Sequence, residues 1–170
     1  MPLAKLALRE LEPGDIVTRF SLGHANLAPL KVFLRKKAKD YHTQNIAKTY
    51  VLADEDKAQI YGYVSLVCSQ VKLEVNNPVP DFPYDYPCVK IVRLAIDKEL
   101  KGKGLGKDLI SWSISISKER IMPHVGCRFL VVDSKASAIQ FYEKCGFTLL
   151  DTETNKASAH PLLFLDLLKI

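Results

Sequence analysis

A strand that runs directly into a glycine-rich turn is the feature that most constrains this chain of 170 residues. The strand is expected over Cys88–Asp97, and the turn Lys101–Lys107 has every second residue as glycine from 102 to 106. Apolar residues at helical spacing then predict a helix over Gly104–Arg120. Glycine reaches positive φ and lets backbone N–H groups approach a ligand, while a helix N-terminus adds unpaired donors and partial positive charge. The arrangement suits a phosphate or diphosphate group.

The glycine turn alone is open to other interpretations. A P-loop requires GxxxxGK[ST], but Asp108 follows Gly106-Lys107 here and the spacing is one residue short. A dinucleotide-binding loop has GxGxxG early in a βαβ unit, whereas this chain has GxGxG late in its length. A tight turn between strand and helix that binds nothing remains the third interpretation.

The remaining pattern mixes strands with helices. Further strands are expected at Leu3–Leu11, Lys48–Ala53, Ile60–Val71, Cys127–Asp133, Phe147–Leu150 and Leu162–Leu168. Helices are expected near residues 30–41 and between Ser134, as N-cap, and Gly146, as C-terminal glycine. Four prolines make Asn76–Pro87 an irregular loop. This order predicts an α+β (mixed α/β) fold and a single domain over residues 1–170.

The charge of the chain favours an anionic partner. Its net charge is +5, a modest excess whose placement matters more than its size. Five basic residues share the predicted helix near residues 30–41: Lys31, Arg35, Lys36, Lys37 and Lys39. Such a face is either simply solvated or able to contact RNA phosphates.

Several classes of protein do not fit the composition. No stretch approaches the roughly 20 apolar residues that span a bilayer, and the N-terminus lacks a signal-peptide pattern, so no membrane association is expected and the predicted location is the cytoplasm. The histidines are scattered without ligand spacing, so no metal site is expected. The cysteines 68, 88, 127 and 145 lie in apolar segments and are expected to be reduced core residues.

Two motifs, in this order, resemble the GNAT superfamily of N-acetyltransferases. Leu94-Ala95-Ile96, followed by Lys101-Gly102-Lys103-Gly104-Leu105-Gly106, is similar to the acetyl-CoA motif Q/R-x-x-G-x-G/A, with lysine at the first position. Ala138–Phe147 matches the A-x-x-F-Y-x-x-x-G-F signature. The resemblance implies the GNAT fold: a central mixed, mostly antiparallel twisted sheet of six to seven strands, with helices on both faces. It also implies that the strands at 88–97 and 127–133 splay apart.

The same resemblance implies the chemistry, with acetyl-CoA giving its acetyl group directly to an amine in a ternary complex. Backbone groups of Leu94, Ala95 and Ile96 would bind the pantetheine arm and polarise the thioester carbonyl. The diphosphate would lie on Lys101, Gly102, Lys103, Gly104, Leu105, Gly106 and Lys107. Tyr142 would be the general acid that protonates the leaving thiolate, the alternative being a core aromatic. No general base stands out in the sequence.

A second resemblance, to the GNAT toxins of toxin–antitoxin pairs, concerns the acceptor. Phe20-Ser21-Leu22-Gly23, Phe33-Leu34 with Ala38, Gln44–Val51 and Arg93–Asp97 are similar to segments of those toxins. Leu22 replaces the cysteine of F-S-C-G, and the L-D before Phe33 is absent or displaced. The resemblance implies aminoacyl-tRNA as acceptor and an antitoxin as partner, and permits a homodimer.

Arg93 is assigned to substrate binding, because in a regular strand its side chain lies on the face opposite Leu94. Three alternatives stay open for the activity: a GNAT acting on a small amine, one acting on a protein N-terminus, and a non-catalytic acetyl-CoA-binding module.

Overall fold

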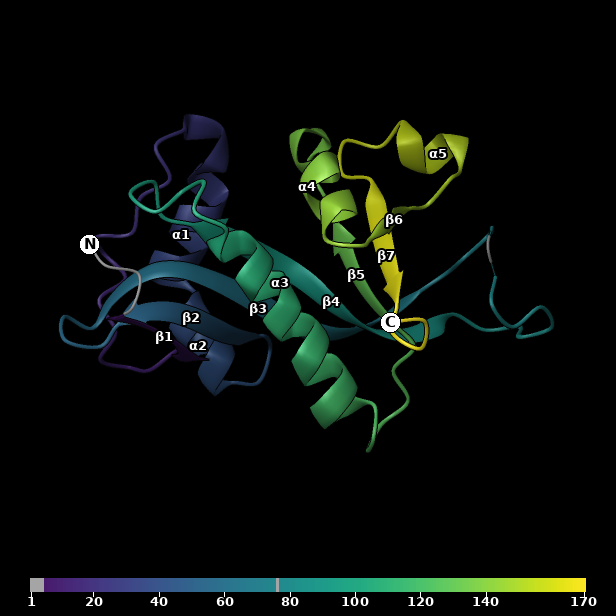
Figure 1. Cartoon of the computed structure of the whole chain (residues 1–170), viewed down its shortest axis with the longest axis horizontal. Coiled ribbons are helices and arrows are strands. Elements are labelled where there is room, and N and C mark those ends of the chain that lie inside the picture. Colours follow the sequence, from purple (N-terminus) through teal and green to yellow (C-terminus); the bar gives the residue numbers. More distant parts are fainter. Residues whose placement is uncertain (1–4, 76) are drawn as a thin grey trace. The chain divides into compact units, whose positions relative to one another are not determined.

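The computed structural model describes residues 5–75 and 77–170, and seven strands form its sheet (Figure 1). The strands are β1 (Leu6–Glu10), β2 (Lys48–Asp54), β3 (Gln59–Val71), β4 (Tyr86–Ile96), β5 (Phe129–Asp133), β6 (Thr148–Leu149) and β7 (Leu162–Asp166). Their order in the sheet is β1-β2-β3-β4-β5-β7-β6. β4 pairs with β5 in parallel, and β5 and β6 pair antiparallel to β7. The expected mixed α/β fold with a six- to seven-stranded sheet is therefore confirmed.

The chain divides into two compact units, which are described one at a time. Unit 1 contains the described residues up to Val67 together with Val92–Leu109, and unit 2 contains Cys68–Ile91 and Ile110–Ile170. Within unit 2 the parallel register of β4 and β5 runs from Cys88↔Phe129 to Ile91↔Val132. The predicted splay beyond that register involves both units and stays a prediction, as does the single domain.

Unit 1 is built on an antiparallel hairpin covered by two helices. β2 pairs with β3 from Lys48↔Leu66 to Asp54↔Gln59, and β1 pairs along the other edge of β2. The turn that the polar run 54–57 predicts is present, with the Asp54 carboxylate accepting from the Asp56 N–H at 3.1 Å. The helices are α1 (Ala28–Lys36) and α2 (Ala38–Thr43). They pack on the sheet through a buried cluster that includes Phe20, Phe33, Leu34, Ala38, Val51, Ala53, Ile60, Tyr63 and Ala95.

Unit 2 carries the last strands and helix α4 (Ile139–Lys144), which follows a 3₁₀ turn at Ala136–Ala138. Its core gathers Val71, Leu73, Tyr86, Cys88, Phe129, Val131, Leu150 and Phe164. The aromatic rings of Phe129 and Phe164 pack edge to face, with their centroids 5.9 Å apart. Gly146 adopts φ +95° directly after α4, so the predicted C-terminal glycine is confirmed.

Some element predictions were wrong. The helix near residues 30–41 is broken at Lys37, whose φ of −126° lies outside the helical range. Ser134 is not the N-cap: its hydroxyl donates to the Lys135 carbonyl, and Lys135 precedes the 3₁₀ turn. Pro87 lies inside β4 rather than in the irregular loop.

The sequence pattern also missed two features. Helix α5 (Glu153–Lys156) is capped by the Thr152 hydroxyl, which accepts from the Asn155 N–H. Helix α3 (Leu105–Ile116) ends in a π-type turn over Ser117–Ile121.

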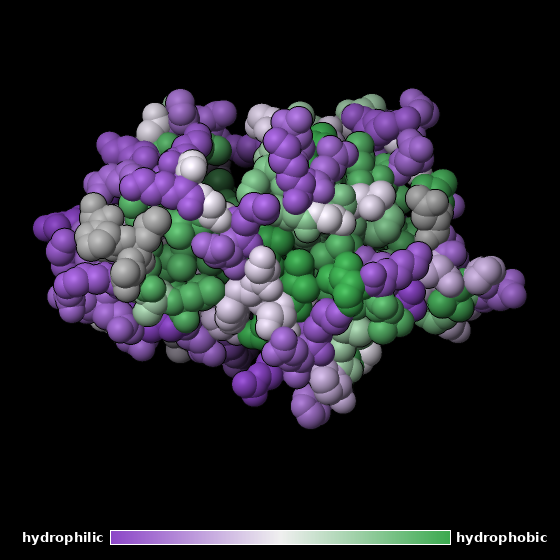
Figure 2. All heavy atoms as spheres, viewed as in Figure 1, coloured by the Kyte–Doolittle hydropathy of each residue, from purple (hydrophilic) through white to green (hydrophobic). Residues whose placement is uncertain are grey.

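The hydropathy of the face shown in Figure 2 does not single out one site. On the face shown in Figure 2, hydrophilic and apolar residues alternate in small patches. Among the described residues, no helix is long and apolar enough to cross a membrane. The candidate site must therefore be located from individual residues.

Candidate active site

The end of β4 lies against a glycine on its neighbour. Ala95 is buried at 6% exposure, and the Asp97 N–H donates to the Tyr61 carbonyl at 2.8 Å. A Cβ on Gly62 would lie 2.8 Å from Ile96 Cδ1 and 3.0 Å from a Leu52 methyl carbon, closer than side chains tolerate. Glycine at position 62 therefore lets β3 pack closely against Ile96, part of the predicted pantetheine-binding stretch.

Arg93 is exposed and anchored within unit 1. Its guanidinium stacks over the Phe33 ring at 5.3 Å, and its Nη1 donates to the Val92 carbonyl at 2.6 Å. A cation over an aromatic ring is held in a defined direction while remaining accessible. The Arg93 side chain is thus ordered by α1, on the same face of β4 as Ala95, which belongs to the buried cluster that contains Phe33.

The glycine turn requires its glycines for backbone conformation rather than for space. Gly102 and Gly104 have φ of +81° and +84°, and a Cβ on either would meet nothing within 4 Å. Residues 101–104 are exposed, and α3 begins directly afterwards at Leu105. Within the described chain, the N–H groups of residues 102–106 donate to no backbone carbonyl outside regular helices and strands.

These free donors, the N-terminus of α3 and three exposed lysines fit a diphosphate group. The lysines are Lys101, Lys103 and Lys107. The Lys107 N–H turns back to the Gly104 carbonyl at 2.9 Å, which starts the helix. All seven residues predicted to hold the diphosphate lie together in unit 1.

Tyr142 lies in unit 2, on the buried side of α4. Its ring is 7% exposed and contacts Phe141 and Phe147 edge to face, with centroids 5.0 and 5.6 Å away. Burial, with a smaller contribution from Cys145, raises the pKa of the Tyr142 phenol. The phenol therefore keeps its proton at neutral pH and is available as a proton donor to a group that develops negative charge beside it.

The cysteines offer no nucleophile in the core. Burial raises the pKa of the Cys88 thiol to about 11 and also raises the pKa of Cys127. Cys68 is exposed, so the expectation that every cysteine is a core residue was wrong for it. Alternation along β3 explains this, because residues 68 and 70 are its outward-facing positions.

The predicted basic face is only partly a free surface. The Arg35 guanidinium donates to the Phe20 carbonyl from Nε at 3.2 Å and from Nη2 at 2.6 Å. The Lys39 ammonium donates to the carbonyls of Pro13 and Asp15 at 2.6 and 2.8 Å. Arg35 is exposed, as expected, and Lys39 is half-buried, but both cations are partly engaged by carbonyl groups of the loop that precedes α1.

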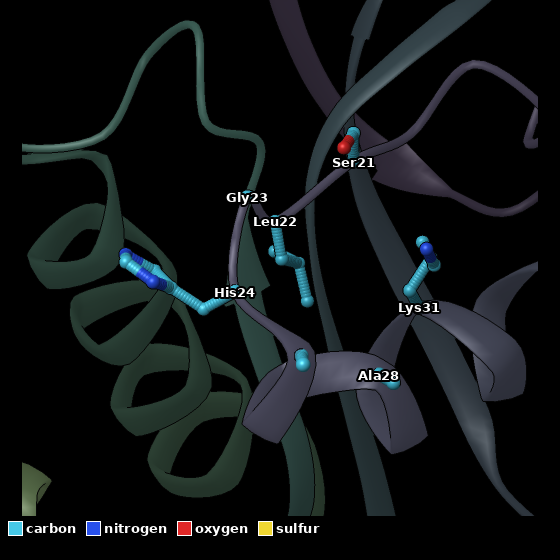
Figure 3. A pocket seen from close by; sticks show the side chains of 7 residues that line it. Ser21, Leu22, Gly23, His24, Ala28 and Lys31 are labelled. Atoms are coloured by element: carbon cyan, nitrogen blue, oxygen red, sulfur yellow. The ribbon is translucent and has the colours of Figure 1, made fainter.

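The sequence reasoning also missed a pocket of about 220 Å³ beside these contacts. Figure 3 shows it between the start of α1 and the segment before it. Its lining is Ser21, Leu22, Gly23, His24, Ala25, Ala28 and Lys31. Only the resemblance of residues 20–23 to F-S-C-G pointed to this segment, and nothing in the spacing indicated a cavity.

Comparison with known proteins gives the family context. The family model described as an acetyltransferase (GNAT) domain matches residues 45–149, which include the glycine turn and Tyr142. The tRNA-acetylating toxin of Mycobacterium tuberculosis (strain ATCC 25618 / H37Rv) is 26% identical over 155 residues, covering 86% of this chain and 87% of the toxin. Glucosamine 6-phosphate N-acetyltransferase of Trypanosoma brucei brucei is 29% identical over 148 residues, covering 85% of this chain and 90% of that enzyme.

Solved structures agree with the fold. A crystal structure of a KacT variant superposes with a TM-score of 0.84 and 26% identity, covering 97% of this chain and 96% of that one. AtaT complexed with acetyl-methionyl-tRNAfMet gives a TM-score of 0.82 and 25% identity, covering 96% of each chain.

Proposed function

The chain belongs to the GNAT acetyltransferase family, and on that premise we propose that it transfers the acetyl group of acetyl-CoA to the amine of an aminoacyl-tRNA. The observation that carries the proposal is the exposed turn with two left-handed glycines, which lies between β4 and α3 inside the region matched by the family model. Its exposed backbone N–H groups and the N-terminus of α3 provide the cradle that the diphosphate of a CoA donor requires.

Donor binding is assigned to unit 1. Backbone groups of Leu94, Ala95 and Ile96 bind the pantetheine arm, and an N–H there polarises the thioester carbonyl. The N–H groups of residues 102–106 bind the diphosphate oxygens. The lysines at 101, 103 and 107 add attraction for the phosphates that depends on salt concentration.

The chemical step uses the donor as an acetyl thioester. The acceptor amine attacks the carbonyl carbon, the new C–N bond forms, and the C–S bond breaks with its electron pair on sulfur. Tyr142 gives its phenolic proton to that sulfur, the amine nitrogen loses one proton to solvent, and the phenolate recovers one proton from solvent. The raised pKa of Tyr142 keeps the phenol protonated at neutral pH but makes it a weaker acid than a thiol, so the transfer depends on the sulfur being held next to the hydroxyl and on rapid return of a proton to the phenolate.

The acceptor assignment rests on the relatives. A tRNA-acetylating toxin and AtaT in complex with acetyl-methionyl-tRNAfMet each share about a quarter of their residues with this chain over most of its length. The net charge of +5 supports a polyanionic acceptor. Arg93, ordered over Phe33 and exposed, is assigned to acceptor binding.

The same relatives point to a regulatory partner and to a location. AtaT is also solved as AtaTR bound with acetyl-CoA, and KacT as a KacTA–DNA complex. We extend this to an antitoxin that binds this chain and to the cytoplasm, where charged tRNA is found.

A small phosphorylated amine is the second candidate acceptor, because glucosamine 6-phosphate N-acetyltransferase is 29% identical. Radiolabelled acetyl-CoA tests both, with charged tRNA, the same tRNA uncharged, and glucosamine 6-phosphate as acceptors. Label in charged tRNA alone supports the proposal. Label in glucosamine 6-phosphate alone replaces it, and label in none refutes both.

A further inference from the structure

The segment Phe20–His24, which leads into α1, is fixed from one side by a buried acid. Asp97 is 2% exposed. Its Oδ2 accepts from the Ser21 N–H at 2.7 Å, and its Oδ1 accepts from the Glu99 N–H at 3.0 Å. The Lys98 N–H donates in turn to the Ser21 carbonyl at 2.8 Å. Both backbone groups of Ser21 are therefore held by the residues that lead from β4 into the glycine turn.

The same segment is fixed from its other side by α1. The Arg35 guanidinium donates two hydrogen bonds to the carbonyl of Phe20, the residue before Ser21. The Phe20 ring is fully buried against Tyr63, with centroids 5.6 Å apart. Charged donors and acceptors on backbone groups are among the strongest hydrogen bonds in proteins.

The pocket described above is built on this segment. Ser21, Leu22, Gly23 and His24 form part of its lining, and Lys31 of α1 contributes another part. In Figure 3 the side chains of Leu22 and His24 point in different directions from the segment Phe20–His24, and Lys31 extends from α1. The shape of the pocket therefore depends on the backbone conformation of that segment. A Cβ on Gly23 would lie 3.7 Å from the Lys98 side chain. The segment Phe20–His24 therefore lies beside Lys98, which leads from β4 into the glycine turn.

We infer that Asp97 and Arg35 are positioning residues that together hold Phe20–His24 in the shape needed for this pocket to receive the acceptor. The inference rests on the proposed function: Asp97, which holds Ser21, directly follows Leu94–Ile96, the stretch assigned to the thioester that the acceptor has to reach. Neither side chain touches the acceptor. Each acts through a backbone group of a neighbouring residue, which pre-organises the pocket before binding.

Kinetics with charged tRNA test the inference, using Arg35→Gln and, as a matched control, Lys36→Gln. Both remove one positive charge from adjacent positions of α1, but Lys36 is exposed and the structure gives it no bond to Phe20. Arg35→Gln is expected to raise the acceptor KM roughly 10- to 100-fold more than Lys36→Gln, the range for losing a hydrogen bond to a charged group. The Kd of acetyl-CoA should change less than about 3-fold, because Arg35 contributes no group to the residues assigned to the donor and Asp97 still holds the other side of the segment.

Salt dependence separates positioning from phosphate contact. Losing a phosphate contact lowers the slope of log KM against log salt by roughly 0.7–0.9, whereas losing the bond to Phe20 leaves that slope unchanged. In the double variant Arg35→Gln with Asp97→Asn, the rise in acceptor KM, expressed as a free energy, should be smaller than the sum of the rises in the two single variants. The reason is that both groups hold the same segment. The inference is overturned if Arg35→Gln has the same acceptor KM as Lys36→Gln and a lower slope of log KM against log salt.

Hydrogen–deuterium exchange of the peptide covering residues 20–24 tests the clamp without any acceptor. Exchange should rise at least several-fold in Arg35→Gln and in Asp97→Asn and stay at the wild-type rate in Lys36→Gln. Unchanged exchange in both clamp variants overturns the inference. If Arg35→Gln does not fold, Asp97→Asn and the charge-preserving Arg35→Lys carry the test. If the wild-type enzyme leaves charged tRNA unlabelled, the proposed function is refuted. The hydrogen–deuterium exchange result does not depend on that outcome.

Discussion

Replacing Gly104 by alanine isolates the backbone requirement of the donor-binding turn. Gly104 has φ +84°, and a Cβ there would meet nothing within 4 Å, so the substitution adds no clash. Its whole cost is the left-handed conformation, about 1–2 kcal/mol for a residue with a Cβ. If the turn keeps its shape, the free energy of unfolding falls by that amount. If the turn relaxes instead, acetyl-CoA binding must restore it and its Kd rises about 5- to 30-fold.

Chemical denaturation and titration calorimetry with acetyl-CoA measure these two quantities together. Gly14→Ala is the matched control, because Gly14 also has open space for a Cβ but does not have positive φ. It should leave both quantities within about 0.5 kcal/mol of wild type. Gly104→Asn should recover part of the loss, since asparagine tolerates the left-handed region. A Gly104→Ala protein with wild-type stability and wild-type Kd would refute the reasoning.

Three further predictions follow from single side chains. Tyr142→Phe should keep acetyl-CoA affinity and lower turnover roughly 10²- to 10⁴-fold in single-turnover assays, and unchanged turnover would make Tyr142 a packing residue. Gly62→Ala should cost at most about 1 kcal/mol of stability, because its Cβ would meet only the terminal methyl carbons of Ile96 at 2.8 Å and Leu52 at 3.0 Å, which can shift; a much larger fall in melting temperature would contradict this. Burial alone would raise the pKa of Asp166, but hydrogen bonds from Arg128 at 2.7–2.8 Å outweigh it and lower that pKa. The resulting stability is present above about pH 4 and lost as pH falls through the lowered pKa, so Asp166→Asn should flatten the acid side of a melting-temperature profile.

The glycine turn and the tyrosine signature could be identified from the sequence because their signals are local. A strand, glycines at alternate positions and the first apolar residues of a helix fix backbone conformation within about twenty residues. The structure confirms this at Gly102, Gly104 and Gly146, all with positive φ. The same local signals could not set the break at Lys37, since no proline or glycine marks it and burial of Ala38 in the core accompanies it.

The remaining differences come from groups that are distant in the sequence. Asp97 and Ser21 are 76 positions apart, and Arg35 meets a carbonyl 15 residues before it. A backbone carbonyl has no signature in the amino-acid sequence, so a lysine or arginine that binds one looks the same as a solvated cation until the chain has folded. The sequence by itself therefore determined the family motifs, the succession of strands along the chain and the conformation of the glycine turn. Only the tertiary structure decided which charges hold Phe20–His24 in place, because those hydrogen bonds form when loops far apart in the chain pack together.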